Sequence, residues 1–454
     1  MFPWRRQQAS AIAIFGAESN PFAGAVVLAG AAGIGLPVVG CDFHGPYREK
    51  GHWLLGDYPE MVTRLNAEVS YRFLDPEMPA VDLPYLLESR SNAWVVVLLN
   101  CPARAQNALL ALVEEGITAP VLLMLTGPGG LVVDRHADPA RALESAMALP
   151  AATVALGPPE LAVAAGGIIL NEIMLAQGHE EGASSRTVGF YSLHRRRRIS
   201  VDNGPVGELA REVATRPEGT TAAFAGRKLI MVGAGALGNW SVIPMALESP
   251  QEIVIYDGDS EVAPHNVNRQ ILLVGGVGQS RSKVEVLTEA LVALDPAGSY
   301  RGIPSFVRQA EDLAGLDDAD ALLCVPDNDE TRLVCDEARR RAAVPFATAG
   351  SSGVGGQVIV RRPGEGCLRC LGLNGEAMEE GARGQSCALV QNDAVVSSNM
   401  VTSGIMISEL REALAGREPA NIRFVGDSRR GNRLARMISR AACTHVAPAQ
   451  LLAS

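Results

Sequence analysis

The chain has 454 residues, a formal net charge of −10 and a hydrophobic content of 47%. This length favours two or three folded domains. The negative charge argues against a general nucleic-acid binder, because such a protein gains affinity by neutralising phosphates. Eight cysteines, several of them in apolar strand-like runs, fit reduced thiols better than a disulfide framework. We therefore expect a cytoplasmic globular protein without a nucleic-acid partner.

The first elements along the chain are apolar. A strand pattern covers residues 11–16, and the 20 residues from Phe22 to Cys41 carry no charge. That stretch is long enough to span a membrane, but five glycines and Pro37 interrupt it. A buried helix followed by a buried strand explains the pattern better, so we expect no membrane partner. The N-terminus also lacks the apolar core and small-residue cleavage site of a signal peptide.

The two halves of the chain show the same patterns in the same order. Residues 94–130 read as an apolar strand, a helix and a second apolar strand that leads to a Gly-Gly pair, and residues 321–356 repeat this series. Long apolar helical stretches around 167–172 and 404–409 also correspond. We predict a duplicated α/β domain, and chance similarity between two α/β folds is the alternative.

The differences between the halves concern one region. Gly235 and Gly238 of the second half have no glycine counterparts, since the first half has Glu18 and lacks the third glycine. Opposite Asp327 the first half has Ala103. We therefore predict one intact and one lost nucleotide site. The predicted bounds are 1–180 for the inactive domain, 181–225 for a linker or crossover segment and 226–454 for the active domain.

A glycine motif, Gly233-Ala-Gly235-Ala-Leu-Gly238, follows an apolar strand pattern at 229–232. Gly233 permits a tight turn, Gly235 lets a phosphate approach the backbone, and Gly238 lets the helix pack on the strand. Asp257 and Asp259 end the next strand pattern, where a carboxylate bonds ribose hydroxyls. This combination predicts a nucleotide-binding βαβ unit.

Three charged residues further along fit a triphosphate better than a dinucleotide. Arg269 and Lys283 supply positive charge for phosphate oxygens. Asp327 follows a buried strand pattern and is placed to hold Mg²⁺ between phosphates. The alternative for Asp327 alone is a helix N-cap.

These motifs make the second half similar to the adenylating domain of the ThiF/MoeB and ubiquitin-activating enzyme superfamily. The glycine motif, Asp-x-Asp, Asn-x-Asn-Arg-Gln, the lysine and Pro-Asp-Asn fall in the family's order between about 227 and 445. The resemblance implies two Rossmann-like, ThiF-type doubly wound domains in tandem. They would form a single-chain pseudo-dimer about a pseudo-twofold axis, the first domain degenerate and the second catalytic.

The same resemblance assigns roles to single residues, with ATP and Mg²⁺ as cofactors. Asp257 and Asp259 would bind ribose and metal, and Asp327 would bind Mg²⁺. The residues implied to hold the phosphates and complete the nucleotide site are Asn266, Asn268, Arg269, Gln270, Lys283 and Asn328. In related pairs, an arginine before the inactive half reaches the active site. In this chain Arg6 matches that arginine best. The alternative is a basic N-terminal tail without this role.

The cysteines suggest two further sites. Cys367 and Cys370 have zinc-knuckle spacing, and Cys443 with His445 stands where the family places a second pair. A structural zinc held by three cysteines and a histidine and a lost site both stay open. Cys387, in the predicted cysteine loop 371–394, precedes a long apolar helix, as does the thioester-forming cysteine of related enzymes. A structural thiol is its alternative role.

The resemblance implies an activating enzyme for a ubiquitin-like protein. Such an enzyme adenylates the C-terminus of its substrate, forms a thioester and passes it to a conjugating enzyme, and compact relatives occur in bacterial antiviral operons. Adenylation of a sulfur-carrier protein or of a natural-product peptide is the alternative. A nicotinamide-dependent oxidoreductase would leave Arg269, Lys283 and Asp327 without a role, and a non-catalytic scaffold would leave the whole cluster unexplained.

Overall fold

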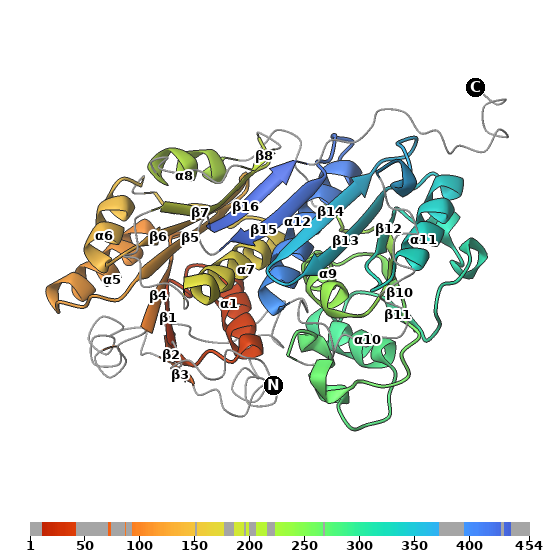
Figure 1. Ribbon diagram of the computed structural model, residues 1–454, viewed down its shortest axis with the longest axis horizontal. Coiled ribbons are helices and arrows are strands. Elements are labelled where there is room, and N and C mark those ends of the chain that lie inside the picture. The colour runs from red at the N-terminus through yellow and green to blue at the C-terminus, as the bar shows by residue number, and fades with distance from the viewer. Residues whose placement is uncertain are drawn as a thin grey trace.

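The computed structural model describes residues 11–41, 71–73, 87, 93–149, 152–176, 186–194, 197–198, 206–215, 223–266, 268–371, 395–427 and 431–436. Within these ranges the protein is a mixed α/β structure built around two eight-stranded sheets (Figure 1).

The first sheet has the strand order β3-β2-β1-β4-β5-β6-β7-β8. Its strands up to β5 pair in parallel, and the strands from β5 to β8 pair antiparallel. The strands are β1 (Ala11–Phe15), β2 (Val38–Cys41), β3 (Tyr71–Phe73), β4 (Ala93–Leu98), β5 (Val121–Gly127), β6 (Gly130–His136), β7 (Arg186–Ser192) and β8 (Arg197–Arg198).

The second sheet repeats this arrangement, with the order β11-β10-β9-β12-β13-β14-β15-β16. Its strands from β11 to β13 are parallel and those from β13 to β16 are antiparallel. They are β9 (Lys228–Val232), β10 (Glu252–Tyr256), β11 (Tyr300–Ile303), β12 (Ala321–Cys324), β13 (Phe346–Ser352), β14 (Gly355–Arg361), β15 (Ile422–Asp427) and β16 (Gly431–Arg436). Strands that correspond between the two halves in sequence therefore hold corresponding places in the two sheets.

Of the described helices, α1 (Pro21–Ile34), α7 (Pro159–Ala176), α9 (Ala236–Ala246) and α12 (Val396–Leu414) lie between the two sheets (Figure 1). They are buried on nearly every face, and their apolar residues join one core cluster that extends from the first sheet to the second. α12 packs against α7, α9 and α1. The predicted buried helix and buried strand within Phe22–Cys41 are α1 and β2.

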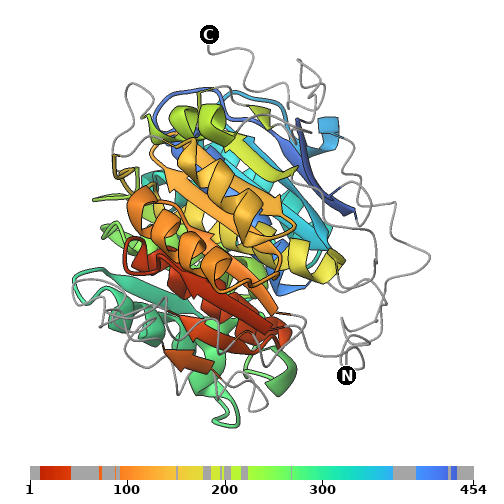
Figure 2. The same cartoon turned by 90° about the vertical axis from the view of Figure 1, so that its left-hand side faces the viewer.

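The outer faces of the sheets have cores of their own. Helices α5 (Pro102–Glu114), α6 (Pro139–Met147) and α8 (Val206–Ala214) cover the first sheet, and α5 and α6 appear in orange on its near face in Figure 2. α11 (Asp329–Ala342) covers the second sheet. Alternate residues of one strand face the two layers, as Ile12 and Ile14 do against Ala13 and Phe15, so the parallel strands are apolar throughout.

The segment 181–225, predicted as a linker, contains β7, β8 and α8. β7 pairs with β6 in the first sheet, and α8 contributes Leu209 and Val213 to its outer core. The strand and helix are too short to give the sustained apolar period on which the sequence prediction relied.

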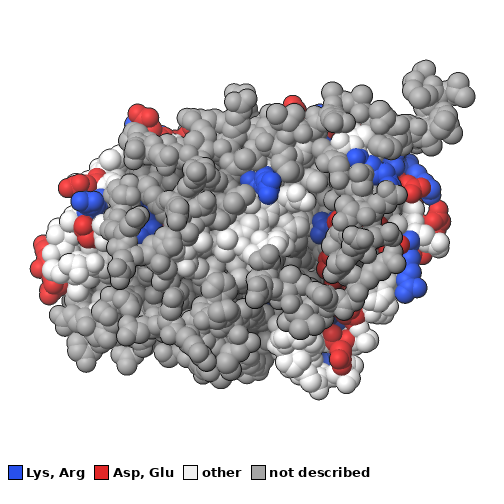
Figure 3. Space-filling model, in the orientation of Figure 1, with Lys and Arg blue, Asp and Glu red and all other residues white. Residues whose placement is uncertain are grey.

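One described helix, α7, is long and apolar enough to cross a membrane, but 78% of its apolar window is buried inside the protein. That burial is expected of a helix between two sheets. On the face shown in Figure 3, acidic and basic side chains gather at the end that carries α11, where Arg341 pairs with Glu311 and Glu337.

Candidate active site

The predicted site residues follow three neighbouring parallel strands of the second sheet. β9 leads into Gly233, β10 into Asp257, and β12 into Asp327 two residues after Val325. Because the strands are parallel, these three turns meet at one edge of the sheet. A Cβ on Gly233 would lie 2.7 Å from the Val325 carbonyl oxygen, so the turns after β9 and β12 are in direct contact.

The three glycines of the motif have different structural roles. Gly233 has a φ of +103° and Gly238 packs so closely that a Cβ would lie 2.2 Å from the Gly233 carbonyl oxygen. Gly235 is the N-cap of α9, and a Cβ there would meet no atom within 4 Å. The backbone at Gly235 is therefore open, at a helix N-terminus that favours an anion.

The two aspartates after β10 have different environments. Asp257 accepts hydrogen bonds from the backbone N–H of Ala234 at 2.7 Å and of Asp259 at 2.9 Å. Burial raises the pKa of Asp257, although both N–H groups and Lys283 favour its charged form. The Asp259 side chain is 49% exposed and pairs with Lys283. Asp257 thus holds the glycine turn, and Asp259 is the carboxylate that is open to a ligand.

Lys283 is fixed at the start of α10 (Lys283–Leu294). Ser282 caps that helix and shares a capping box with Glu285. The Lys283 ammonium group lies 2.5 Å from Asp259 Oδ2, and its side chain is only 9% exposed. A phosphate that approached the glycine turn would compete with Asp259 for this cation.

The predicted phosphate-binding turn lies between two short 3₁₀ helices, η2 (Pro264–Asn266) and η3 (Ile271–Gly276). The Asn266 carbonyl accepts hydrogen bonds from the N–H groups of Arg269 at 3.2 Å and Gln270 at 2.9 Å. The side-chain oxygens of Asn268 and Gln270 are buried and have no hydrogen-bond partner among the described residues. This turn is therefore tight and carries two unsatisfied acceptors.

The first half of the chain touches this turn through α1. A Cβ on Gly33 would lie 2.3 Å from the Asn268 carbonyl oxygen, so only a glycine allows this approach. The position of Asn268, and with it the neighbouring Arg269, therefore depends on a helix from the other half of the molecule.

The turn after β12 presents Asp327 as an exposed carboxylate. Asn328, and not Asp327, caps α11, because its side chain accepts the Thr331 N–H at 2.8 Å. The alternative role of Asp327 as the N-cap is therefore wrong. Asn328 also donates to Asp327 Oδ1 at 3.3 Å, so both groups of its side chain already interact within the turn.

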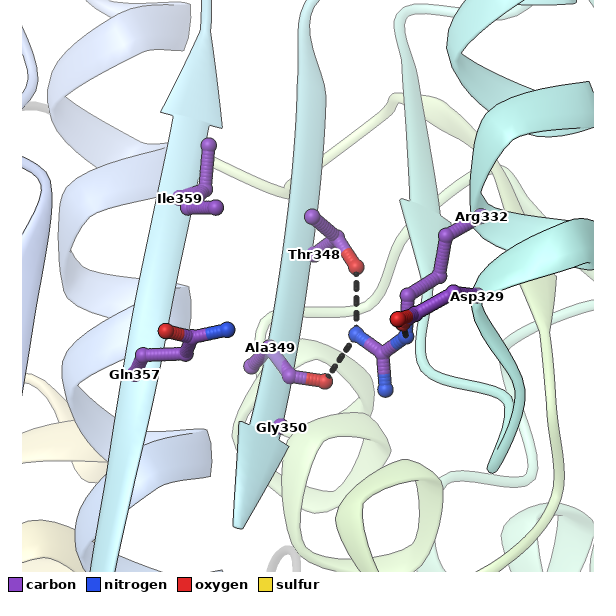
Figure 4. Close-up of a pocket in the computed structure, with 7 residues that line it drawn as sticks. All are labelled: Asp329, Arg332, Thr348, Ala349, Gly350, Gln357 and Ile359. Carbon is purple, nitrogen blue, oxygen red and sulfur yellow. Dashed lines mark hydrogen bonds and ion pairs between the residues drawn. The ribbon is translucent and has the colours of Figure 1, made fainter. Parts of the chain in front are cut away.

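A small pocket beside this turn is lined by Asp329, Arg332, Thr348, Ala349, Gly350, Gln357 and Ile359 (Figure 4). Arg332 donates to Thr348 Oγ1 at 2.9 Å, to the Ala349 carbonyl at 2.5 Å and to the Pro326 carbonyl at 2.6 Å. Arg332 thereby ties the residue before Asp327 to β13.

Three residues of this region were not found from the sequence. Arg332 and Asn239 hold turns in place through hydrogen bonds, which no sequence pattern revealed. Phe306 is 55% exposed and its ring packs on Gly258, between the two aspartates, so that a Cβ on Gly258 would come within 2.5 Å of three ring atoms. The only sequence signal for Phe306 was that an aromatic residue follows the third parallel strand, β11 (Tyr300–Ile303), after a few residues.

The cysteines are described only in part. The sulfur atoms of Cys367 and Cys370 lie 3.6 Å apart, near the separation of about 3.8 Å that two Zn–S bonds of about 2.3 Å impose at the tetrahedral angle. No group of three or more metal-ligating side chains occurs within the described ranges. Cys443 and His445, like Cys387 and Arg6, lie outside the described residues.

A glycine turn, an open carboxylate and a cation at the carboxyl edge of parallel strands define a doubly wound nucleotide-binding protein. Residues 210–441 match the ThiF family. Because this match covers just over half of its length, the chain belongs to the ThiF family.

The chain is also similar to individual proteins of known sequence or structure. The chain is 28% identical over 158 residues to the sulfur carrier protein ThiS adenylyltransferase of Escherichia coli K12, a match that covers 34% of this chain and 62% of that protein. Among solved structures, E. coli MccB with AMPCPP and selenomethionine MccA shares 19% identity at a TM-score of 0.43, covering 52% of this chain and 70% of that one. E. coli MccB with ATP shares 18% identity at a TM-score of 0.42, covering 52% and 71%.

Proposed function

We propose that the protein is an ATP-dependent adenylyltransferase that activates the C-terminal carboxylate of a protein substrate. The observation that carries this proposal is the meeting of the open Gly235 turn, the Asp259–Lys283 pair and the Asp327 turn at one sheet edge. Membership of the ThiF family and the match to a sulfur-carrier adenylyltransferase support it.

The site residues fit a nucleoside triphosphate. The phosphates belong at Gly235 and the start of α9, where the backbone is open. Asp259 is exposed and suits the ribose hydroxyls, whereas both oxygens of Asp257 already accept backbone N–H groups. The exposed ring of Phe306 offers a flat apolar surface for the base.

Asp327 fits Mg²⁺ as a single carboxylate. Magnesium is usually held by one or two carboxylates together with substrate phosphates and water, and Asp327 is exposed at the edge where the phosphates belong. When bound, the ion would neutralise charge on the phosphates.

The proposed reaction is an attack by the substrate carboxylate on the α-phosphorus of ATP. A bond forms between the carboxylate oxygen and this phosphorus, and the bond to the pyrophosphate oxygen breaks. Lys283 and Arg269 would stabilise the negative charge that gathers on the phosphate oxygens. Lys283 would have to leave Asp259 for the phosphates, which a flexible lysine side chain permits.

We propose further that the two halves form a pseudo-twofold pair in which only the second binds a nucleotide. The shared strand order supports the pairing. At the matching edge of the first sheet, Asn20 donates to Asn100 at 2.9 Å and to Thr126 at 3.0 Å. Glu18, which replaces a motif glycine, pairs with Arg104. Protein side chains thus occupy the edge that a nucleotide would need.

The substrate we favour is a ubiquitin-like protein, with Cys387 as the thioester-forming nucleophile and a conjugating enzyme as the acceptor in a bacterial antiphage system. Arg6 would reach the active site from the first half, and Cys367, Cys370, Cys443 and His445 would hold a structural zinc. A sulfur-carrier protein is the second candidate substrate. It is favoured by the match to the ThiS adenylyltransferase.

ATP–pyrophosphate exchange with candidate carrier proteins tests the adenylation step. We expect Lys283→Ala and Asp327→Ala to lower exchange by at least about 100-fold, because each removes charge stabilisation from the transition state. Arg341→Ala, which removes exposed ion pairs with Glu311 and Glu337, is the matched control and should exchange normally. Exchange that survives Asp327→Ala would remove the magnesium role of this residue.

Trapping of a protein adduct tests the thioester step. We expect Cys387→Ala to keep ATP–pyrophosphate exchange and to lose a carrier-protein adduct that is cleaved by added thiol, because adenylation precedes transfer to sulfur. Cys101→Ala, at a free cysteine without a role in the proposed reaction or zinc site, controls for the loss of a different thiol. An enzyme that exchanges pyrophosphate but never forms the adduct would favour the sulfur-carrier alternative.

A further inference from the structure

Asn239 is a buried polar residue that follows the last glycine of the motif. It lies in the first turn of α9 and is 0% exposed. An asparagine in such a place must satisfy an amide donor group and an amide acceptor within the protein, because unsatisfied buried polar groups are costly.

All of its side-chain groups are used, and they join two turns of the site. Nδ2 donates to the carbonyl oxygens of Ala234 at 2.8 Å and Gly235 at 3.0 Å. Oδ1 accepts the backbone N–H of Leu272 at 3.0 Å. Leu272 is the second residue of η3, directly after the turn that carries Arg269.

The side-chain bond to the Ala234 carbonyl fixes the direction of the amide that follows it. The bond to the Gly235 carbonyl adds to the backbone hydrogen bond by which the Asn239 N–H already holds that carbonyl at 2.9 Å. In a trans peptide the C=O and the following N–H point in opposite directions. With the Ala234 and Gly235 carbonyls turned toward Asn239, the N–H groups of Gly235 and Ala236 point away from it. The Ala234 N–H is already bonded to Asp257, and the space at Gly235 is open.

We propose that Asn239 is a positioning residue for phosphate binding. Through the Ala234 carbonyl it aims the Gly235 N–H group at the nucleotide phosphates, beside the Ala236 N–H group that the first turn of α9 already points outward. Through Leu272 it sets the distance between the glycine turn and the Arg269 turn. This inference rests on the proposed ATP site and names the residue that positions its phosphate-binding groups.

The test compares nucleotides with and without phosphates. Binding of the ATP analogue AMPCPP and of adenosine is measured by calorimetry or competition for wild type and Asn239→Asp. The substitution keeps the shape and an acceptor for Leu272 but removes both donors. Each lost neutral bond is worth about two- to tenfold, so we expect AMPCPP affinity to fall about tenfold or more while adenosine affinity stays within about twofold.

Two further variants separate positioning from folding and from added charge. Asn239→Ser is neutral, and its hydroxyl can still reach the Gly235 carbonyl one turn back, so it should lose less AMPCPP affinity than Asn239→Asp, again without a change for adenosine. Ser241→Ala alters another fully buried residue of α9 whose hydroxyl has no hydrogen-bond partner among the described residues, and should bind like wild type.

The outcomes are distinct. If Asn239→Ser and Asn239→Asp bind AMPCPP as wild type does, or lose AMPCPP and adenosine equally, the positioning role is overturned. If Asn239→Asp does not fold, the AMPCPP and adenosine affinities of Asn239→Ser alone test the positioning role. If wild type itself fails to bind AMPCPP, the proposed ATP site is wrong and the failure does not concern Asn239.

Discussion

At the scale of single residues, neighbours in one motif have separate tasks. Gly233 and Gly238 allow close packing, whereas Gly235 leaves the backbone open. Asp257 is buried and holds the glycine turn, whereas Asp259 is exposed and pairs with Lys283. A motif written as Asp-x-Asp therefore combines one residue that shapes the site with one that faces a ligand.

The raised pKa of Asp257 gives nucleotide binding a pH dependence. Burial makes its carboxylate take up a proton at a higher pH than in the unfolded chain. Between the pKa of Asp257 in the unfolded chain and its raised pKa in the folded chain, the folded chain binds more protons than the unfolded chain does. The contribution of this group to folding stability therefore rises as the pH falls. The protonated carboxyl accepts the Ala234 and Asp259 N–H groups less well, so AMPCPP affinity should fall together with the pH.

Asp257→Asn is the reference for this prediction. It should bind AMPCPP more weakly at every pH, because an amide has one oxygen for two N–H donors. The ratio of wild-type to variant affinity cancels the titration of the ligand itself. A ratio that does not change with pH down to the ordinary aspartate range would contradict the prediction.

At the scale of elements, the start of α11 is what places Asp327. Asn328 caps the helix, and Arg332, one turn further on, bonds the Pro326 carbonyl and β13. Thr348 of β13 also donates to the Cys324 carbonyl at 2.6 Å, at the end of β12. Helix, turn and two strands are thereby fixed as one unit behind the exposed carboxylate of Asp327.

Arg332→Lys should loosen this unit. A lysine ammonium is a point charge and cannot reproduce the planar arginine fork that reaches Pro326, Thr348 and Ala349 together. We expect the Mg²⁺ concentration for half-maximal pyrophosphate exchange to rise about tenfold, as is typical when the support of a metal ligand is lost. Arg340→Lys on the same helix should leave it unchanged. An unaltered Mg²⁺ requirement in Arg332→Lys would show that Asp327 needs no support from α11.

At the scale of the whole molecule, charged groups are buried between the two sheets. Arg411 of α12 bonds Glu160 of α7 at 2.6 and 3.0 Å, and it also pairs with Glu248, just after α9. Burial disfavours the guanidinium charge, but the two glutamates outweigh it and raise the pKa of Arg411. Tyr191 of β7 donates to Glu409 of α12 at 2.7 Å. These bonds join the halves of the chain.

Arg411→Met should destabilise the protein by about 3–5 kcal/mol, because the buried Glu160 and the half-buried Glu248 would keep their charges without this partner. Guanidinium unfolding followed by circular dichroism measures this loss. The double variant Arg411→Met/Glu160→Gln removes one of these charges as well and should recover part of the lost folding stability. Arg341→Met breaks two exposed pairs and should change little. An unfolding midpoint for Arg411→Met equal to that of wild type would mean that this network does not stabilise the paired halves.

The repeated strand–helix series of the two halves and the turns that carry the candidate site residues could be predicted from the sequence. Apolar runs, glycines and charged residues at strand ends follow local rules, so the buried helix and strand within Phe22–Cys41 and the turn at Gly233 were predicted. The β7 strand was not, because seven residues within a polar segment give too little pattern. Asn328 and Asp327 are adjacent, and only the cap geometry distinguished their roles.

By itself, the sequence determined the glycine turn, the acidic residues after β10, the cations that follow and membership of the ThiF family, because each depends on residue type and spacing along the chain. The tertiary structure decided which aspartate is buried, that Asn239 joins two turns, and that Gly33 of one half touches Asn268 of the other. Those features depend on contacts between residues far apart in sequence, and such contacts form only when the sheets and the helices between them have packed.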